Sequence, residues 1–190
     1  MKLRRILTTT TALLCAGPAY GLTIRGTVEG GGGDDLRVAG FAVSPFGQVT
    51  EEISSVPVEG GRFVLELPMT APTARAQVDL TPQNVTWPGV IDPVSVSTQA
   101  RVAEMKFFVY RDLNRNGRRD DAEALRDVMP NVERATLFVA WVNTDVTVKA
   151  SRGYEATLKR GWNALIVDVG RAVRVQPFAD STVVTVRLAR

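Results

Sequence analysis

The chain has 190 residues, of which 45% are hydrophobic and 23% are charged, and its formal net charge is +3. This composition is typical of a globular protein and excludes a disordered, collagenous or coiled-coil chain. The chain has no His and one Cys, so it lacks imidazole acid–base chemistry and the Ser-His-Asp and Cys-His nucleophile arrangements. We therefore expect that the protein is not an enzyme.

Residues 1–21 have the three regions of a secretory signal peptide. A basic region at residues 2–5 is followed by an apolar, Thr-rich run at residues 6–17 and by two candidate cleavage points, after Ala19 and after Gly21. The apolar run is shorter than the roughly 18 residues that a membrane-spanning helix needs. We expect a secreted protein without a transmembrane span, located in the periplasm, in the cell envelope or on the cell surface.

Two other export signals remain open for this segment. Arg4-Arg5 is a twin-arginine pair, although the residues around it match that signal poorly. Cys15 would fit a lipoprotein signal, but Leu14 stands before it, where that signal needs a small residue.

Loss of the predicted signal peptide changes the charge balance of the chain. It removes Lys2, Arg4 and Arg5, so that 20 of the 23 basic residues remain against 20 acidic ones, and it removes Cys15, the single Cys. The remaining chain is neutral and lacks the concentrated positive charge that nucleic-acid binding requires. It forms no disulfide, so its core, its partners or bound ions must stabilise it.

The rest of the chain is dominated by short strand patterns. Apolar and polar residues alternate in residues 22–28, 62–67 and 184–188, which is typical of half-buried strands. Residues 105–110 and 137–142 are apolar nearly throughout and rich in aromatic and branched side chains, which is typical of central strands. Turn signals separate these runs at short spacing. The pattern predicts an all-β fold, an antiparallel β-sandwich.

A proline-rich segment divides this pattern. Residues 68–93 contain five prolines, which favours a connection or an edge region over a central strand. We place a seam near residue 98, between an N-terminal half at residues 22–98 and a C-terminal half at residues 99–190. Two small packed sandwiches and a single packed unit are both compatible with this division.

Residues 112–123 match the twelve-residue calcium-binding loop at each fixed position. Oxygen atoms at loop positions one, three, five, seven, nine and twelve surround the ion, while Gly117 at position six permits a sharp bend. Three Arg residues and two neutral Asn ligands lie in the loop, so we expect weak binding, on the order of 0.1 to 1 mM. A plain Asn-Gly turn is the alternative. The expected Ca²⁺ ligands are Asp112, Asn114, Asn116, the main-chain carbonyl of Arg118, Asp120 and Glu123.

The sequence also predicts what flanks the loop. Ala122, Leu125 and Val128 would share one face of a short helical stretch over residues 121–128, which Pro130 would end. A strand precedes the loop where an EF-hand has a helix, which argues against a paired EF-hand that opens on ion binding.

The segment from Phe108 to Glu123, together with Leu125, Val128 and the strand at residues 137–142, resembles the calcium-loaded B-type repeats of serine-aspartate-repeat surface adhesins. Those repeats resemble transthyretin-like sandwiches, in which one strand runs into the ion loop and the loop's exit feeds the next strand. The resemblance implies that the side chains at loop positions one, three, five, nine and twelve bind Ca²⁺.

The first half is similar to sandwiches of the transthyretin-like, carboxypeptidase-regulatory type. The similarity is carried by residues 24–28, 38–43 and 61–68. Together, the two resemblances imply a non-catalytic, adhesin-like extracellular module for adhesion, surface scaffolding or cell-wall attachment.

We therefore expect an exported, calcium-stabilised structural or accessory subunit of a bacterial cell-envelope or surface assembly. Its partners would be envelope or surface-layer proteins or cell-wall polysaccharide. The alternative is a carbohydrate-binding module. Trp87 and Trp162 lie near turns and would form an exposed aromatic platform for sugar rings, whereas Trp141 lies in an apolar run and is expected in the core.

Overall fold

The structure is a computed structural model that describes residues 20–31 and 33–188. The predicted signal peptide lies outside the described residues, except for Tyr20 and Gly21, which begin the first strand. Cleavage after Ala19 would leave this strand whole, whereas cleavage after Gly21 would remove its first two residues. In the part of the chain that is described, no helix has the length and apolar character needed to cross a membrane.

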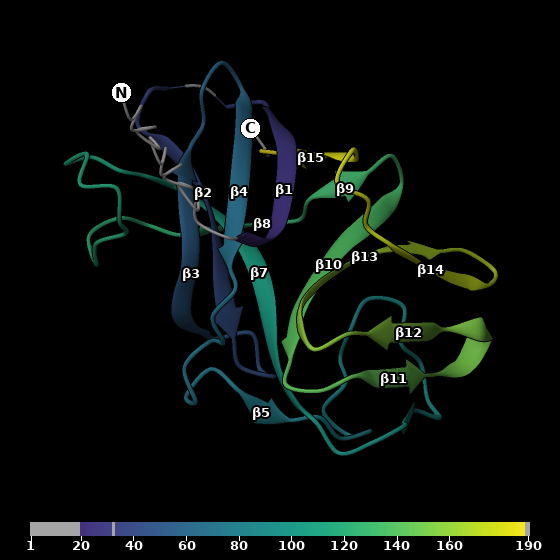
Figure 1. The fold of residues 1–190 in the computed structure, drawn as a ribbon. Coiled ribbons are helices and arrows are strands. Elements are labelled where there is room, and N and C mark those ends of the chain that lie inside the picture. The colour runs from purple at the N-terminus through teal and green to yellow at the C-terminus, as the bar shows by residue number, and fades with distance from the viewer. Residues whose placement is uncertain (1–19, 32, 189–190) are drawn as a thin grey trace, which may run out of the picture.

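The described chain is all-β, which confirms the fold class that the strand patterns predict. A large mixed sheet, which stays open, lies beside a small antiparallel one (Figure 1). The large sheet contains β1 (Tyr20–Glu29), β2 (Leu36–Val43), β3 (Val49–Pro57), β4 (Arg62–Pro68), β5 (Val78–Asp79), β7 (Arg101–Arg111), β8 (Arg126–Val128), β9 (Asn131–Val132), β10 (Ala135–Val142), β13 (Gly161–Val169), β14 (Val173–Pro177) and β15 (Val183–Arg187). The small sheet contains β6 (Ser95–Val96), β11 (Val146–Lys149) and β12 (Glu155–Leu158), with the 3₁₀ turn η1 (Ser151–Gly153) before β12.

The strand order of the large sheet is β3-β2-β7-β10-β9-β15-β1-β4. β13 pairs with β10 and β14, while β5 and β8 pair with β7. β1 and β15, the first and last described strands, run parallel, with Val28 opposite Val186. A fully antiparallel sheet was therefore the wrong prediction for this pair, because alternation within a strand carries no information on the direction of its partner.

The helical stretch predicted for residues 121–128 is absent, and the described residues contain no α-helix. Residues 126–128 form β8, which pairs with β7 and places Val128 opposite Phe107. Val128 is buried in the same hydrophobic cluster as Phe107. Tertiary pairing with β7 therefore overrides the weak helical pattern of this short segment.

The first hydrophobic cluster lies between β1, β4 and β15 on one side and β2 and β7 on the other. Ile24 and Leu65 pack there with Val38 and Val109. The cluster takes side chains from both sides of residue 98, and β2 pairs with β7 along its whole length. The division of the chain into two folding units stays a prediction.

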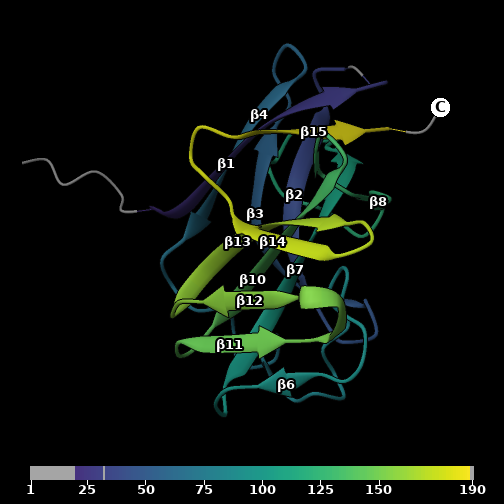
Figure 2. The ribbon, with the colours of Figure 1, turned by 90° about the vertical axis from the view of Figure 1, so that its right-hand side faces the viewer.

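The second hydrophobic cluster lies between the small sheet and the β10–β13–β14 part of the large sheet. Figure 2 shows β14, β12, β11 and β6 stacked along this side of the molecule. Val148, Leu158 and Val167 are almost fully buried in the cluster. The proline-rich segment forms part of its cover, since Leu80 and Trp87 also belong to it. Apart from β5, residues 69–94 form no strand, as their prolines predict.

Candidate functional site

The predicted calcium loop joins β7 to β8, so it closes a hairpin at the end of the longest strand of the fold. Asp112 follows β7 directly, and its main-chain N–H donates to the carbonyl of Asp35 at 2.8 Å. Arg115 and Gly117 have φ values of +58° and +80°, which bend the chain sharply. The bend expected at Gly117 is thus confirmed.

Asp112, at loop position one, is 4% exposed although it is an acidic residue. Its Oδ1 accepts a hydrogen bond from the main-chain N–H of Asn116 at 3.0 Å, and its Oδ2 accepts one from that of Gly117 at 2.9 Å. The carboxylate therefore holds the bend of the loop from inside. A buried carboxylate needs such donors, because burial without them is costly.

Glu123, at loop position twelve, is likewise 4% exposed, and these two residues are the buried charged residues of the described chain. Oε1 of Glu123 accepts from the main-chain N–H of Leu113 at 2.8 Å, and Oε2 accepts from that of Asp120 at 3.0 Å. Glu123 thus connects the start of the loop to its end. Its two oxygens already point into the loop.

The predicted ligands at positions three, five and nine lie together at the loop surface. The amide nitrogens of Asn114 and Asn116 both donate to Oδ2 of Asp120, at 2.5 and 2.9 Å. Their amide oxygens accept main-chain N–H groups, those of Asn116 and Arg118, at 3.1 and 2.8 Å. A cation at this place requires both amides to turn so that their oxygens face it.

A contact that the sequence did not predict places Arg37 of β2 against the loop. Its Nη1 lies 3.7 Å from Oδ2 of Asp112. Ser55 fixes the guanidinium, since Nε donates to its hydroxyl at 2.9 Å and Nη2 to its carbonyl at 3.0 Å. This positive charge competes with a cation for Asp112, which is a further reason to expect weak affinity.

Carboxylates alone do not form a metal centre in this fold. Across residues 20–31 and 33–188, no three Asp, Glu, His or Cys side chains converge closely enough to hold a metal ion. A cation in the loop would need the amide and main-chain oxygens as well, which is the donor set of a calcium loop. The assignment of the six ligands stays a prediction.

The expected aromatic platform is not formed. Trp87 is 2% exposed, and its ring lies 4.9 Å from that of Phe138, centroid to centroid. Trp162 is partly buried, and its Nε1 is enclosed without a hydrogen-bond partner among the described residues. Trp141 is buried, as expected. Exposure of Trp87 was the wrong prediction, because the turn around Trp87-Pro88 folds inward over the second cluster.

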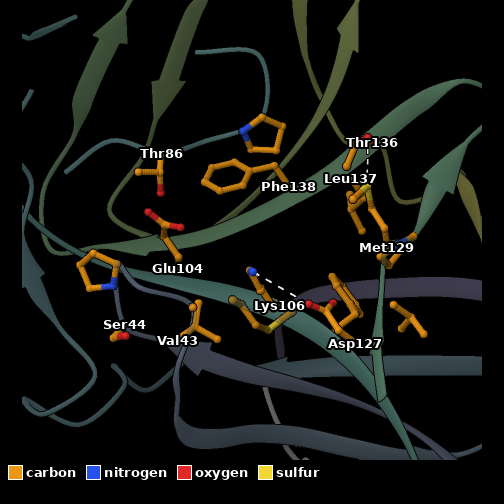
Figure 3. A pocket seen from close by; sticks show the side chains of 17 residues that line it. Val43, Ser44, Thr86, Glu104, Lys106, Asp127, Met129, Thr136, Leu137 and Phe138 are labelled. Carbon is orange, nitrogen blue, oxygen red and sulfur yellow. Dashed lines mark hydrogen bonds and ion pairs between the residues drawn. The ribbon is translucent and has the colours of Figure 1, made fainter. Parts of the chain in front are cut away.

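A cavity of about 480 Å³, which sequence reasoning missed, lies where two strands part along one edge of β7. β10 pairs with residues 102–105 of β7, and β8 pairs with residues 107–109. Three charged side chains line the gap, and Figure 3 shows Glu104 on one side and the pair of Lys106 and Asp127 on the other. The Lys106 Nζ lies 3.9 Å from Oδ2 of Asp127.

Glu104 is the most perturbed acid of the described chain. Burial raises the pKa of its carboxyl from 4.5 to about 7, although a hydrogen bond from Trp87 and the charge of Lys106 act in the opposite direction. The Trp87 Nε1 donates to Oε1 at 2.7 Å. Burial and the charge of Glu104 also raise the pKa of Tyr154, whose enclosed hydroxyl has no hydrogen-bond partner among the described residues.

Replacement of Glu104 by Gln should stabilise the protein at about pH 8. The pKa of Glu104 is higher in the folded state than in the unfolded state. Between about pH 4.5 and about pH 7 the folded state therefore binds more protons than the unfolded state. The contribution of Glu104 to stability therefore falls as the pH rises through this window, and the loss amounts to about 3 kcal/mol. Gln keeps an acceptor for Trp87 and carries no charge. Urea unfolding should show the variant more stable by about that amount at pH 8 and nearly equal to the parent at about pH 4.5. An equal difference at both pH values would contradict the assignment.

Comparisons with protein-family models, with curated proteins and with solved structures give no match for this chain. The resemblance to adhesin repeats therefore rests on the loop and its flanking strands, and it stays a prediction. What the protein does has to be argued from the geometry of its sites.

Proposed function

We propose that the protein is an exported, calcium-stabilised β-sandwich that acts as a structural or accessory subunit of a bacterial cell-envelope or surface assembly. The observation that carries the proposal is the loop at residues 112–123, in which two buried carboxylates hold the main chain in a bend suited to a cation. The packing of β1, β4 and β15 over β2 and β7 supports the transthyretin-like, Ig-like sandwich that the resemblance implies.

The place of the loop favours a stabilising role for the ion over a signalling role. Asp112 follows the end of β7, and Glu123 lies just before β8, which has only three residues. A cation bound by both carboxylates would neutralise two buried charges and hold the hairpin closed. No helix flanks the loop, so the opening of a helix pair, as in EF-hand sensors, has no counterpart here.

Chelation should lower the thermal midpoint of the calcium-loaded protein. At a calcium concentration about one hundred times the dissociation constant, binding adds about 2.7 kcal/mol. About 10 mM calcium reaches this ratio for a dissociation constant of about 0.1 mM, and for a chain of this size the midpoint should then fall by about 5 to 10 °C when excess chelator replaces the calcium. A dissociation constant of about 1 mM would give about half that fall. Differential scanning calorimetry of the chain from Tyr20 onward measures the change.

The control for this experiment is Asp120→Ala, which removes a ligand from the loop surface and should abolish most of the calcium-dependent shift. Asp121→Ala is the matched variant, because Asp121 is an exposed neighbour outside the predicted ligand set. Its shift should equal that of the parent. If the midpoint in calcium equals that of a chelated sample verified to be free of metal, the loop is a turn and the calcium proposal is wrong.

A further inference from the structure

The cavity beside Glu104 lies between two hydrophobic clusters. Along one face of β7, Val102 belongs to the second cluster, and Phe108 belongs to a third, small cluster formed with Phe41 and its neighbours on β2. Glu104 and Lys106 share that face, because side chains alternate along a strand. These two charged side chains lie between the two clusters, so they interrupt the apolar face of β7 at the cavity.

The cavity walls are mostly apolar. Figure 3 shows Phe138 of β10 on the far side of Glu104 from Val43, with Leu137 and Met129 together at another side of the cavity. Pro45, Val128 and Pro130 add further apolar surface. A volume of about 480 Å³ lies within the range of cavities that bind small molecules, and such cavities are largely apolar with a few polar groups that orient the ligand.

The charges in the cavity are not balanced. Lys106 and Asp127, both exposed, form an ion pair with each other across the β7–β8 hairpin. Among the described residues, the hydrogen bond given to the Glu104 carboxylate comes from Trp87 alone and reaches Oε1. Its second oxygen, Oε2, therefore accepts no hydrogen bond from the described residues. The positive charge that acts on the Glu104 carboxyl is that of Lys106, which already pairs with Asp127. The enclosed hydroxyl of Tyr154, whose pKa the charge of Glu104 raises, brings no positive charge.

We propose that this cavity binds a small amphipathic amine, whose protonated amino group docks at the Glu104 carboxylate and whose apolar body fills the space beside Phe138 and Met129. A primary ammonium group supplies both the positive charge and the hydrogen-bond donors that Oε2 lacks. Anionic ligands are disfavoured, because Glu104 and Asp127 both line the cavity. Sugars are disfavoured as well, because the apolar walls would leave many of their hydroxyl groups without partners.

The binding should depend on pH. The pKa of Glu104 is about 7, so its carboxyl is mostly charged at about pH 8 and mostly protonated at about pH 6, whereas an alkylamine remains protonated at both. Affinity should therefore fall about tenfold from pH 8 to pH 6. Lys106, Asp127 and Tyr154 also face this carboxyl, so the pH effect is assigned to Glu104 by comparison with the Glu104→Gln variant.

Titration with 2-phenylethylamine, followed by the indole N–H signals in ¹H–¹⁵N spectra of the calcium-loaded chain, tests this proposal. The Trp87 signal should shift, because its N–H contacts Glu104, while the Trp141 signal should not. The amine should bind at least about tenfold more tightly than the neutral 2-phenylethanol or the anionic 3-phenylpropionate. Equal binding of the alcohol and the amine, or titration without a Trp87 shift, would overturn the proposal.

Two variants separate the ligand site from a general effect on folding. Glu104→Gln should lose the preference for the amine and its pH dependence, whereas Asp127→Asn, which removes the other carboxylate that lines the cavity, should change the affinity less than about threefold. Met129 is exposed at the side of the cavity, so Met129→Trp should block binding without disturbing the core. Unchanged amine binding in Glu104→Gln or in Met129→Trp would place the amine elsewhere and refute the site.

Discussion

Replacement of Asp112 by Ala should destabilise the protein by about 3 kcal/mol even when calcium is absent. The carboxylate of Asp112 is buried and accepts hydrogen bonds from the main-chain N–H groups of Asn116 and Gly117. Its removal leaves the N–H of Gly117 without its acceptor, leaves that of Asn116 with the amide oxygen of Asn114 alone, and removes the carboxylate that pairs with Arg37. Asp112 therefore has a structural role that is independent of the ion. Urea unfolding in excess chelator measures the loss.

Asp121→Ala is again the matched control, since the Asp121 side chain is exposed and makes an ion pair with Arg119, at 3.6 Å. Its effect in chelator should remain within about 0.5 kcal/mol. Asp120→Ala should likewise cost little in chelator but weaken calcium binding. If Asp112→Ala were no more destabilising than Asp121→Ala, the hydrogen bonds inside the loop would not contribute to stability as described.

Replacement of Phe63 by Ala should cost about 3 to 5 kcal/mol. Phe63 on β4 is 3% exposed and belongs to the first cluster. Its ring covers Gly26, the residue opposite it on β1, so closely that a Cβ atom at position 26 would lie 2.3 Å from Cζ of Phe63. The ring therefore fills the space that a side chain on β1 would otherwise occupy. Thermal or urea unfolding gives the loss directly.

A double-mutant cycle tests whether the ring and the glycine act as one unit. Gly26→Ala alone should destabilise the protein by about 1 to 3 kcal/mol, because the new methyl group collides with the ring. In the Phe63→Ala background, the same substitution should cost much less, since the space is then empty. A coupling energy of about 1 kcal/mol or more is expected. If the free-energy changes of the two substitutions simply add, the close contact between the ring and Gly26 does not contribute to stability.

The sequence predicts the parts of this fold that depend on local pattern. Alternation places β1, β4 and β15, and the apolar runs place β7 and β10, because each of these strands buries at least one face. The loop at residues 112–123 is predicted to bind calcium from spacing alone, since its bend needs Gly at one position and acceptors at the others. The structure confirms the bend, whereas the burial of Asp112 and Glu123 is a finding that the spacing does not predict.

The parts that depend on distant segments are not predictable in this way. β3 (Val49–Pro57) carries two adjacent Glu residues and little apolar alternation, and it is a strand because it pairs with β2 along the sheet edge. Residues 126–128 form a strand because β7 offers an unpaired edge beyond β10. Glu104 gives no signal in the sequence, where a single acid in a strand is typical of a solvent-facing position. Its burial arises from Trp87, in a segment that the pattern leaves irregular.

The parallel pair of β1 and β15 has a consequence for how the protein is made. The ribosome synthesises β1 early and β15 more than 150 residues later. Val184 and Val186, which are fully buried beside β1 in the folded protein, are therefore missing from the nascent chain for most of synthesis. During that time, one edge of β1 has unpaired N–H and C=O groups that can pair with a strand of another chain. Contacts so distant in sequence also slow folding. Stalled or clipped chains that lack β15 should therefore be the main source of aggregates.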